Sequence, residues 1–261
     1  MKRLLKSCVL YFIICLCAFS GFAASAQEVY EGIDVSVWQD DIDFEKVKDA
    51  GKEVVYIRAG EGMEEDLRFR ANAKNALDAG LKVGFYYFVT AVDAQQAREQ
   101  ADYFTSLIQD YTYDCRPAVD YEQFGDLSRE QINEIALAFA QRVEENTKVI
   151  PLFYTDYSNV ESLWDDTLAR YPLWVADYSR AELESLGPWS EWAGFQYSDQ
   201  GEVNGIDGAV DLDRFTSMAL IPENPTPPKT GEGTPLLAVL CAMGFASLVL
   251  VAGYRRKPGK A

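Results

Sequence analysis

Two carboxylates stand two positions apart near the middle of the chain, where residues 119–122 read Val-Asp-Tyr-Glu. Because side chains alternate along a strand, Asp120 and Glu122 would point the same way, with Cα atoms about 6 to 7 Å apart. Two negative charges that close raise the pKa of one carboxyl, which gives a proton donor beside an ionised partner. Glycosidic bond cleavage needs this division of roles, but solvated strand ends often carry such a pair with no function.

Further acids occupy comparable places in other strand-like segments. Asp34 lies in the first apolar run, and a carboxylate among β-branched neighbours is costly unless it is paired or functional. The alternative for Asp34 is a capping or internal hydrogen-bonding role. Asp211 follows the last expected strand, and Asp213 competes with it for the same role. Asp177 ends the strand-like segment 173–178.

Aromatic side chains gather at the same segments. Sugar rings have apolar faces that stack on aromatic rings, and tyrosine hydroxyls can bond to the polar rims of sugars. Core packing explains any one of these residues equally well, but the whole group beside four acids indicates a saccharide-binding cleft. Its members are Trp38, Tyr56, Tyr86, Tyr87, Tyr154, Trp174, Tyr178 and Tyr197.

The composition excludes several other chemistries. The chain has no His, which rules out a Ser-His-Asp triad, a Cys-His pair and a His-based zinc site. Of its five Cys, only Cys115 lies outside the apolar segments at the two ends, so the central domain has no internal disulfide. Asp, Glu and Tyr remain for acid–base work.

Strand-like and helical segments alternate over about 190 residues, which predicts an α/β domain with parallel strands. The strands can close into a barrel or lie as an open doubly wound sheet, and in both the ligand site gathers at the strand C-terminal ends. Strands are expected at 32–38, 53–59, 82–90, 116–121, 149–155, 173–178 and 193–198. Helices are expected at 44–50 after Asp43, at 68–79 before Gly80, and after the capping pairs Asp93/Gln96 and Ser128/Gln131.

The first 26 residues are typical of a secretory signal peptide. A basic start precedes an apolar run at 8–22, and residues 24–26 read Ala-Ser-Ala, which suits cleavage by signal peptidase. The alternative is an uncleaved N-terminal membrane anchor. Cleavage is the prediction, because the apolar run is short.

The C-terminal end has the order of parts found in a cell-wall sorting signal. A Pro-rich spacer at 221–235 contains Pro-Pro-Lys-Thr-Gly at 227–231, and an apolar span at 236–254 precedes a basic tail at 255–261. This resembles the Leu-Pro-x-Thr-Gly signal read by sortases, with Pro227 in place of the usual Leu. Sortase would join Thr230 to the wall, and the alternative is a plain membrane anchor.

The domain between these ends, residues 27–220, is strongly acidic. The full chain has a net charge of −17, and removing 1–26 and 231–261 takes away seven Lys or Arg and one acid, leaving −23. Such a charge repels nucleic acid and anionic membranes. The length suits a single domain, which we expect to be monomeric.

Residues 32–215 resemble glycoside hydrolase family 25, the lysozymes that cut between N-acetylmuramic acid and N-acetylglucosamine. Nine pieces match in order over about 180 residues, which makes the resemblance specific. They are Gly-Ile-Asp-Val-Ser with Trp-Gln at 32–39, Ile-Arg-Ala-Gly at 57–60, Asp66/Phe69/Asn72, Ala-Gly-Leu with Val-Gly-Phe-Tyr at 79–86, Asp-Tyr-Glu at 120–122, Tyr-Thr at 154–155, Leu-Trp-Val-Ala at 173–176, Gln-Tyr-Ser at 196–198 and Val-Asp-Leu-Asp at 210–213.

The resemblance implies an irregular (β/α) TIM-like barrel that hydrolyses peptidoglycan strands with retention, without metal or cofactor. By position, Glu122 would protonate the leaving oxygen and Asp120 would help the substrate's own 2-acetamido group attack. Asp34 and Asp211 would hold that group and the water. The residues expected to contact substrate are Arg58, Tyr86, Tyr154, Trp174, Asp177 and Gln196.

Three positions depart from the family pattern: Tyr87 stands where His is frequent, Phe195 where Trp is frequent, and Asp40 where Gly is usual. They concern the cleft wall and leave the acids intact. Two other functions remain open, namely a non-catalytic peptidoglycan-binding protein on the same fold and a glycosidase for another N-acetylated glycan. The sequence thus predicts a secreted lysozyme attached to the wall or outer membrane face of a Gram-positive-type bacterium.

Overall fold

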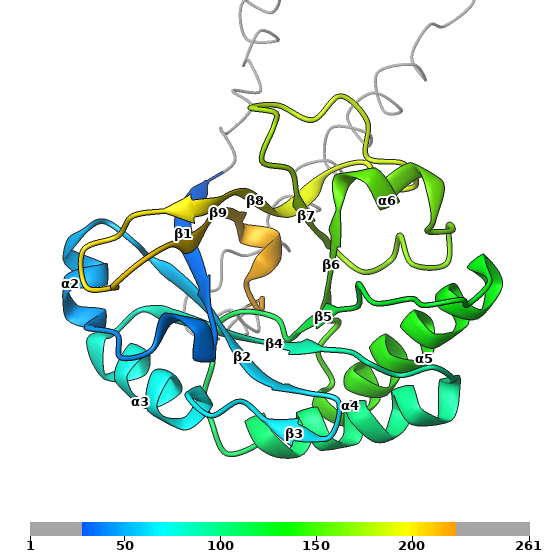
Figure 1. Cartoon of the computed structure of the whole chain (residues 1–261), viewed down its shortest axis with the longest axis horizontal. Helices are drawn as coiled ribbons and strands as arrows, with labels where there is room; N and C mark the ends of the chain where they lie inside the picture. Colours follow the sequence, from blue (N-terminus) through cyan, green and yellow to red (C-terminus); the bar gives the residue numbers. More distant parts are fainter. Residues whose placement is uncertain (1–27, 223–261) are drawn as a thin grey trace, which may run out of the picture. The chain divides into compact units, whose positions relative to one another are not determined.

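The structure, a computed structural model, describes residues 28–222. Within them, eight strands close into a barrel in the order β1-β9-β8-β7-β6-β5-β4-β2, and β1 pairs with β2 to complete the ring (Figure 1). This closure confirms the predicted α/β barrel and decides against the open sheet. The strands are β1 (Val29–Val35), β2 (Val54–Glu61), β4 (Lys82–Phe88), β5 (Ala118–Asp120), β6 (Leu152–Asp156), β7 (Leu173–Ala176), β8 (Trp192–Gly201) and β9 (Val210–Thr216), with the short β3 (Glu64–Glu65) beside β2.

The last barrel strand, β9, was absent from the sequence prediction, which placed Asp211 after the final strand. Asp211 is instead the second residue of β9, which runs antiparallel to both β1 and β8. The expectation of an all-parallel sheet was therefore wrong at this point. The physical reason is that Asp211 and Asp213, two of the three inward residues of β9, are acids and only Phe215 is apolar, so β9 does not show the apolar alternation that usually marks a strand.

The predicted helices are confirmed, and so are their N-terminal caps, except that the Gln96 side chain bonds to the Asp93 carboxylate and the Val92 N–H and so does not complete a capping box with the Asp93 backbone. The helices are α2 (Phe44–Asp49), α3 (Phe69–Ala79), α4 (Ala94–Ile108) and α5 (Arg129–Thr147). Asp43 and Asp93 accept from backbone N–H groups of the first turn, and Ser128 with Gln131 forms a full capping box. Gly80 ends α3 with a φ of +71°, which favours glycine.

Three short helical segments were not predicted: α6 (Tyr157–Ser162), η1 (Val37–Gln39) and η2 (Ser217–Ala219). The expected strand 32–38 ends at Val35, because Ser36 and Gln39 form a capping box that turns the chain into η1. This turn carries Trp38 away from the sheet and leaves its side chain 79% exposed.

Large aromatic rings fill the inside of the barrel. Tyr56, Trp174 and Phe215 pack together, with ring centroids 4.8 to 5.3 Å apart. Glycines opposite them provide the room: a Cβ on Gly84 would lie 2.5 Å from the Tyr56 ring, and one on Gly194 would lie 2.7 Å from Trp174. This alternation of small and large residues is how a small barrel closes without a pore.

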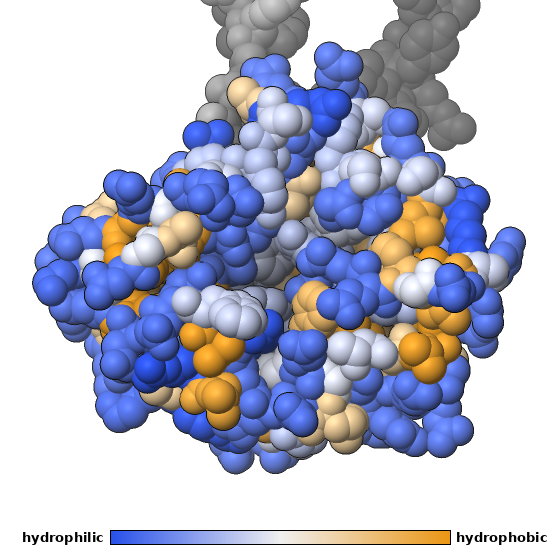
Figure 2. Space-filling model, viewed as in Figure 1, coloured by the Kyte–Doolittle hydropathy of each residue, from blue (hydrophilic) through white to orange (hydrophobic). Residues whose placement is uncertain are grey.

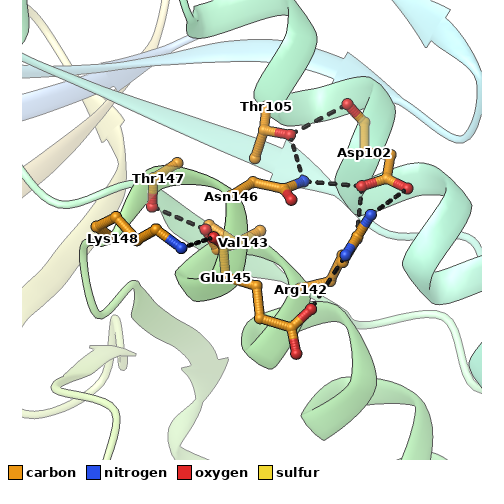
Figure 3. Close-up of polar contacts among 8 residues, drawn as sticks. All are labelled: Asp102, Thr105, Arg142, Val143, Glu145, Asn146, Thr147 and Lys148. Carbon is orange, nitrogen blue, oxygen red and sulfur yellow. Dashed lines mark hydrogen bonds and ion pairs between the residues drawn. The ribbon is translucent and has the colours of Figure 1, made fainter.

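Helices cover the outside of most of the barrel, whereas neither β8 nor β9 is followed by an α-helix (Figure 1). The apolar faces of α4 and α5 meet β4, where the rings of Tyr87, Phe104 and Phe139 lie with centroids 5.1 to 6.3 Å apart. A polar cluster also joins the two helices: Arg142 donates to both carboxylate oxygens of Asp102, at 2.6 and 3.2 Å (Figure 3). The helix pair is therefore fixed by both apolar and charged contacts.

The surface of the described domain is largely polar. The face seen in Figure 2 is mostly hydrophilic, with apolar residues in separate small patches. Within residues 28–222, no helix combines the length and the apolar character needed to cross a membrane. The predicted signal peptide, sortase-like motif, apolar span and basic tail all lie outside the described residues and remain predictions.

Candidate active site

The carboxyl pair lies at the mouth of the barrel. Asp120 is the last residue of β5, where it pairs in register with Phe88 of β4 and Tyr154 of β6. Its side chain is buried, whereas Glu122, two residues beyond the strand, reaches the exposed wall of the cleft. The two carboxyls lie within hydrogen-bonding reach of each other. The predicted common direction of the pair is therefore observed.

A cavity of about 260 Å³ opens in front of this pair. It brings together nine of the ten predicted site residues from strands far apart in the sequence, all at one end of the barrel. Its lining consists of Asp34, Ser36, Trp38, Gln39, Arg58, Tyr86, Phe88, Asp120, Glu122, Tyr154, Trp174, Tyr178, Gln196 and Asp211.

The surroundings of the pair favour retention of a proton. Burial is the main cause that raises the pKa of Asp120 well above its usual range, and the negative charge of Glu122 adds to it. Burial also raises the pKa of Glu122, although the hydrogen bond with Asp120 opposes this rise. The expectation that only one carboxyl would be perturbed is too simple, because the pKa of buried Asp120 rises well above its usual range and that of Glu122 rises as well.

Arg58 supplies positive charge to the cavity. It lies on β2, faces Asp120, and lowers the pKa of that carboxyl against the effect of burial. Its Nε donates to Asp66 Oδ2 at 2.8 Å, and the side chain of Asp66 is almost fully buried. Asp66 also accepts from the backbone N–H of Val37 at 3.0 Å, so one carboxylate fixes both Arg58 and the turn that carries Trp38.

A second group of carboxyls lies across the cavity. Asp34 of β1 and Asp211 of β9 are direct partners in the antiparallel ladder, which places both side chains on the inner face. Burial is the main cause that raises the pKa of both, to about 6 for Asp211 and well above the usual range for Asp34. The sequence left the choice between Asp211 and Asp213 open, and the structure places Asp211 in the cavity wall and Asp213 beneath it.

Gln196 connects the tyrosines of the cavity to Asp34. Its Oε1 accepts from the hydroxyls of Tyr154 and Tyr178, at 2.9 and 2.7 Å, and its Nε2 donates to Asp34 Oδ2 at 2.7 Å. Because every bond fixes the donor or acceptor sense of the next, the amide has one favourable orientation. The chain of bonds holds Asp34 with one oxygen already engaged.

Asp177 is the predicted site residue that the main cavity does not include. Its carboxylate is turned toward its own loop, where it accepts from the N–H and hydroxyl of Ser179 and pairs with Arg180. It lines a neighbouring cavity of about 590 Å³, which shares Glu122, Tyr154 and Tyr178 with the first. Its contact with substrate therefore remains a prediction.

Sequence reasoning missed three lining residues: Ser36, Gln39 and Phe88. Ser36 and Gln39 have the Ser-x-x-Gln spacing of a capping box, a signal that could have revealed a turn at the cleft edge. Phe88 carries no comparable signal, because it reads as one more apolar residue of a strand.

Similarity to known proteins identifies the family of the chain. The sequence profile described as "Glycosyl hydrolases family 25" matches residues 33–206. The chain is 36% identical over 197 residues to the autolytic lysozyme of Clostridium acetobutylicum, covering 73% of this chain and 57% of that protein. It is 32% identical over 202 residues to lysozyme M1 of Streptomyces globisporus, covering 72% of this chain and 68% of that protein. The chain thus spans little more than half the length of the first of these relatives.

Among solved structures, the bacterial lysozyme from Streptomyces coelicolor superposes with a TM-score of 0.65 at 30% identity, over 75% of this chain and 98% of that one. The muramidase from Acremonium alcalophilum shares the fold, with a TM-score of 0.63 at 24% identity over 73% of this chain and 98% of that one. The family profile covers most of the barrel, and the carboxyls of the matching motifs meet in one cavity. The chain therefore belongs to glycosyl hydrolases family 25, the lysozyme-type glycoside hydrolases.

Proposed function

We propose that this chain is a lysozyme that cleaves the β-1,4 bond between N-acetylmuramic acid and N-acetylglucosamine in peptidoglycan, with retention of configuration. The observation that carries the proposal is the Asp120–Glu122 pair, one member buried and one at the cleft wall, in a cavity lined by two more acids and by aromatic rings. Family membership and the lysozymes among the relatives support the reaction class.

In the proposed first step, Glu122 donates its proton to the glycosidic oxygen as the bond from that oxygen to the anomeric carbon breaks. The carbonyl oxygen of the substrate's 2-acetamido group forms the new bond to the anomeric carbon. Asp120 orients the amide and balances its developing positive charge. Glu122, now ionised, then takes a proton from the water that opens the ring intermediate, and two inversions give net retention.

The remaining cavity residues position the sugar. Asp34 and Asp211 hold the acetamido group and the attacking water from the side opposite Glu122. Trp174 and Tyr154 form an aromatic wall with ring centroids 5.1 Å apart, and Tyr86 packs edge-on against Trp174 at 6.3 Å. The rings that line the cavity with an exposed face, those of Trp38 and Tyr178, can stack on the apolar faces of sugar rings. Arg58 and Gln196 supply hydrogen-bond donors.

The test is digestion of purified peptidoglycan by residues 27–230, with fragments identified by mass spectrometry. New reducing ends at muramic acid are expected with the natural chain. Glu122→Gln keeps the size and hydrogen bonding of the side chain but cannot donate a proton as a carboxylic acid does. We expect it to lose at least about a hundredfold in kcat, in line with a missing general acid.

Each alternative function has its own signature in the same experiment. Intact glycan that nevertheless binds the protein would replace the proposal with a non-catalytic wall binder. Intact peptidoglycan without binding, but cleavage of another N-acetylated glycan, would move the activity to that substrate. New reducing ends at glucosamine would contradict the proposed bond.

We also propose that the enzyme acts outside the cell, attached to the wall through Thr230 after cleavage of residues 1–26. The support is the sequence order of signal peptide, barrel, Pro-rich spacer, sortase-like motif, apolar span and basic tail. Signal peptidase and a sortase would be its processing partners. Mass spectrometry of muramidase-released wall material should find Thr230 joined to a wall peptide; a chain recovered only in membranes, with its tail intact, would contradict the attachment.

A further inference from the structure

Asp213 is a carboxyl with no solvent contact directly beneath the active site. Its side chain is 0% exposed and points from β9 into the barrel. The indole Nε1 of Trp174 donates to its Oδ1 at 2.9 Å, while its Oδ2 has no hydrogen-bond partner among residues 28–222. A buried carboxylate with one oxygen unpartnered is costly. A proton between Oδ2 of Asp213 and a neighbouring oxygen would remove this cost.

Asp34 is the neighbour that can share a proton with Asp213. Its side chain lies within hydrogen-bonding reach of Asp213, and its Oδ2 already accepts from Gln196. In the Asp34–Asp213 pair, each carboxyl thus accepts from one neutral donor: Trp174 donates to Asp213, and Gln196 donates to Asp34. No Lys or Arg within residues 28–222 forms an ion pair with either carboxyl, so two negative charges here would face each other without a counterion.

The other groups near Asp213 do not remove this repulsion. Asp211 adds a further negative charge from the same strand, and Lys52 acts only from a distance while pairing with Glu31 at 3.5 Å. The tyrosines that face it have pKa values raised above their usual range, mainly by burial, and stay neutral. The titratable groups around it are Asp34 of β1, Lys52 before β2, Tyr56 of β2, Tyr197 of β8 and Asp211 of β9.

We propose that Asp213 is a positioning residue for Asp34: the two carboxyls share one proton, and this bond fixes Asp34 beneath the substrate. Burial is the main reason that the pKa values of both carboxyls rise, to about 8 for Asp213 and well above the usual range for Asp34, which agrees with a proton retained by the pair at neutral pH. The pair then carries one negative charge instead of two. Asp34 is held on one side by Gln196 and on the other by Asp213, so that it faces the cavity in a single orientation. The consequence for catalysis rests on the proposed function.

Asp213→Asn tests the shared proton directly. The amide can accept from Trp174 through Oδ1 and donate to Asp34 through Nδ2, so it imitates the protonated pair at every pH. The probe is the indole ¹H–¹⁵N NMR signal of Trp174. It is recorded on residues 27–230, which include every described residue. The signal is assigned as the one that disappears in Trp174→Phe. We expect this signal to show a titration step near pH 8 in the natural chain that is absent from Asp213→Asn, whereas a step near pH 6 from Asp211 would be common to both proteins. Asp207→Asn, the same change on an exposed loop, should leave the titration intact.

Activity gives the second readout. Asp213→Leu, which cannot hold Asp34, should lose at least tenfold in kcat with intact folding, and Asp213→Asn, which can still donate to Asp34, should recover most of that loss at neutral pH. A Trp174 signal that does not move with pH in the natural chain would overturn the shared proton, whatever the activity. Full activity in Asp213→Leu, or a tenfold loss in Asp213→Asn, would overturn the positioning role. The signal is measured without substrate, so its failure is distinct from a failure of the proposed reaction.

Discussion

At the scale of single residues, Arg58 opposes the protonation of Asp120. Its positive charge favours the ionised carboxylate, while burial and Glu122 favour the neutral acid. Asp66 fixes Arg58 from behind with a 2.8 Å bond. The proposed mechanism needs Asp120 ionised when the substrate's amide becomes positive. The charge at residue 58 should therefore shift the pH at which activity declines on the acid side of the pH profile.

Replacing Arg58 with Gln should raise the pKa of Asp120, because the carboxylate loses its opposing charge. Activity that requires ionised Asp120 would then decline at a higher pH on the acid side of the kcat/KM profile. Arg58→Lys keeps the charge and serves as the matched control, with a smaller displacement. The measurement is the pH profile of soluble glycan hydrolysis; an acid limb that does not move in Arg58→Gln would contradict the role of this charge.

Protonation of Asp213 makes the stability of the fold depend on pH. Its pKa is raised to about 8 in the folded chain, against about 3.9 when unfolded. The folded chain therefore binds a proton that the unfolded chain has lost between these values, and its contribution to stability falls as pH rises from about 4 to 8. Each pKa unit of difference corresponds to about 1.4 kcal/mol.

Asp213→Asn removes this titration, so it should unfold at a higher temperature than the natural chain, and the gain should be larger at pH 8 than at pH 5. Asp207→Asn should show no such difference. Thermal unfolding at the two pH values gives the answer. A gain that is equal at both would mean that Asp213 does not titrate in this range.

At the scale of elements, the inner face of the barrel depends on pairs of small and large residues. Gly84 of β4 leaves space for the Tyr56 ring, and Tyr56 in turn packs on Trp174 in the cavity wall. The floor of the active site is thus positioned by the same contacts that close the barrel.

Gly84→Ala should destabilise the fold by about 1 to 3 kcal/mol, because a Cβ would lie 2.5 Å from the Tyr56 ring. Gly51→Ala is the control for backbone strain alone: its φ is +89°, and nothing lies within 4 Å of the added Cβ. We expect about 1 kcal/mol for that change, the cost of placing a Cβ at positive φ. Denaturant unfolding measures both, and equal costs would show that packing against Tyr56 does not limit the position.

Helix ends were the elements that the sequence predicted best. Ser128 with Gln131, and Gly80 after α3, act through local hydrogen bonds and backbone conformation that a few neighbouring residues determine. Strand β9 was missed because its direction depends on pairing with β1, nearly 180 residues earlier. Such long-range pairing leaves no local pattern when the inward residues are acids.

At the scale of the whole molecule, the sequence left barrel and open sheet undecided, since both share the same alternation of strands and helices. The pairing of β1 with both β2 and β9 decides between them. The active site, too, could be predicted only in part from the sequence. Asp120, Glu122, Asp34 and Asp211 could be predicted from the sequence, whereas the place of Asp213 under the cavity follows only from barrel closure.

The proposed mechanism fixes the stereochemistry of the product, because attack by the substrate's acetamido group followed by water gives two inversions at the anomeric carbon. The measurement is ¹H NMR of a soluble peptidoglycan oligosaccharide during the first minutes of hydrolysis by residues 27–230, beside Glu122→Gln. We predict that the β-anomer of N-acetylmuramic acid forms first and that Glu122→Gln forms none. Initial release of the α-anomer, or equal rates for the two proteins, would contradict the mechanism.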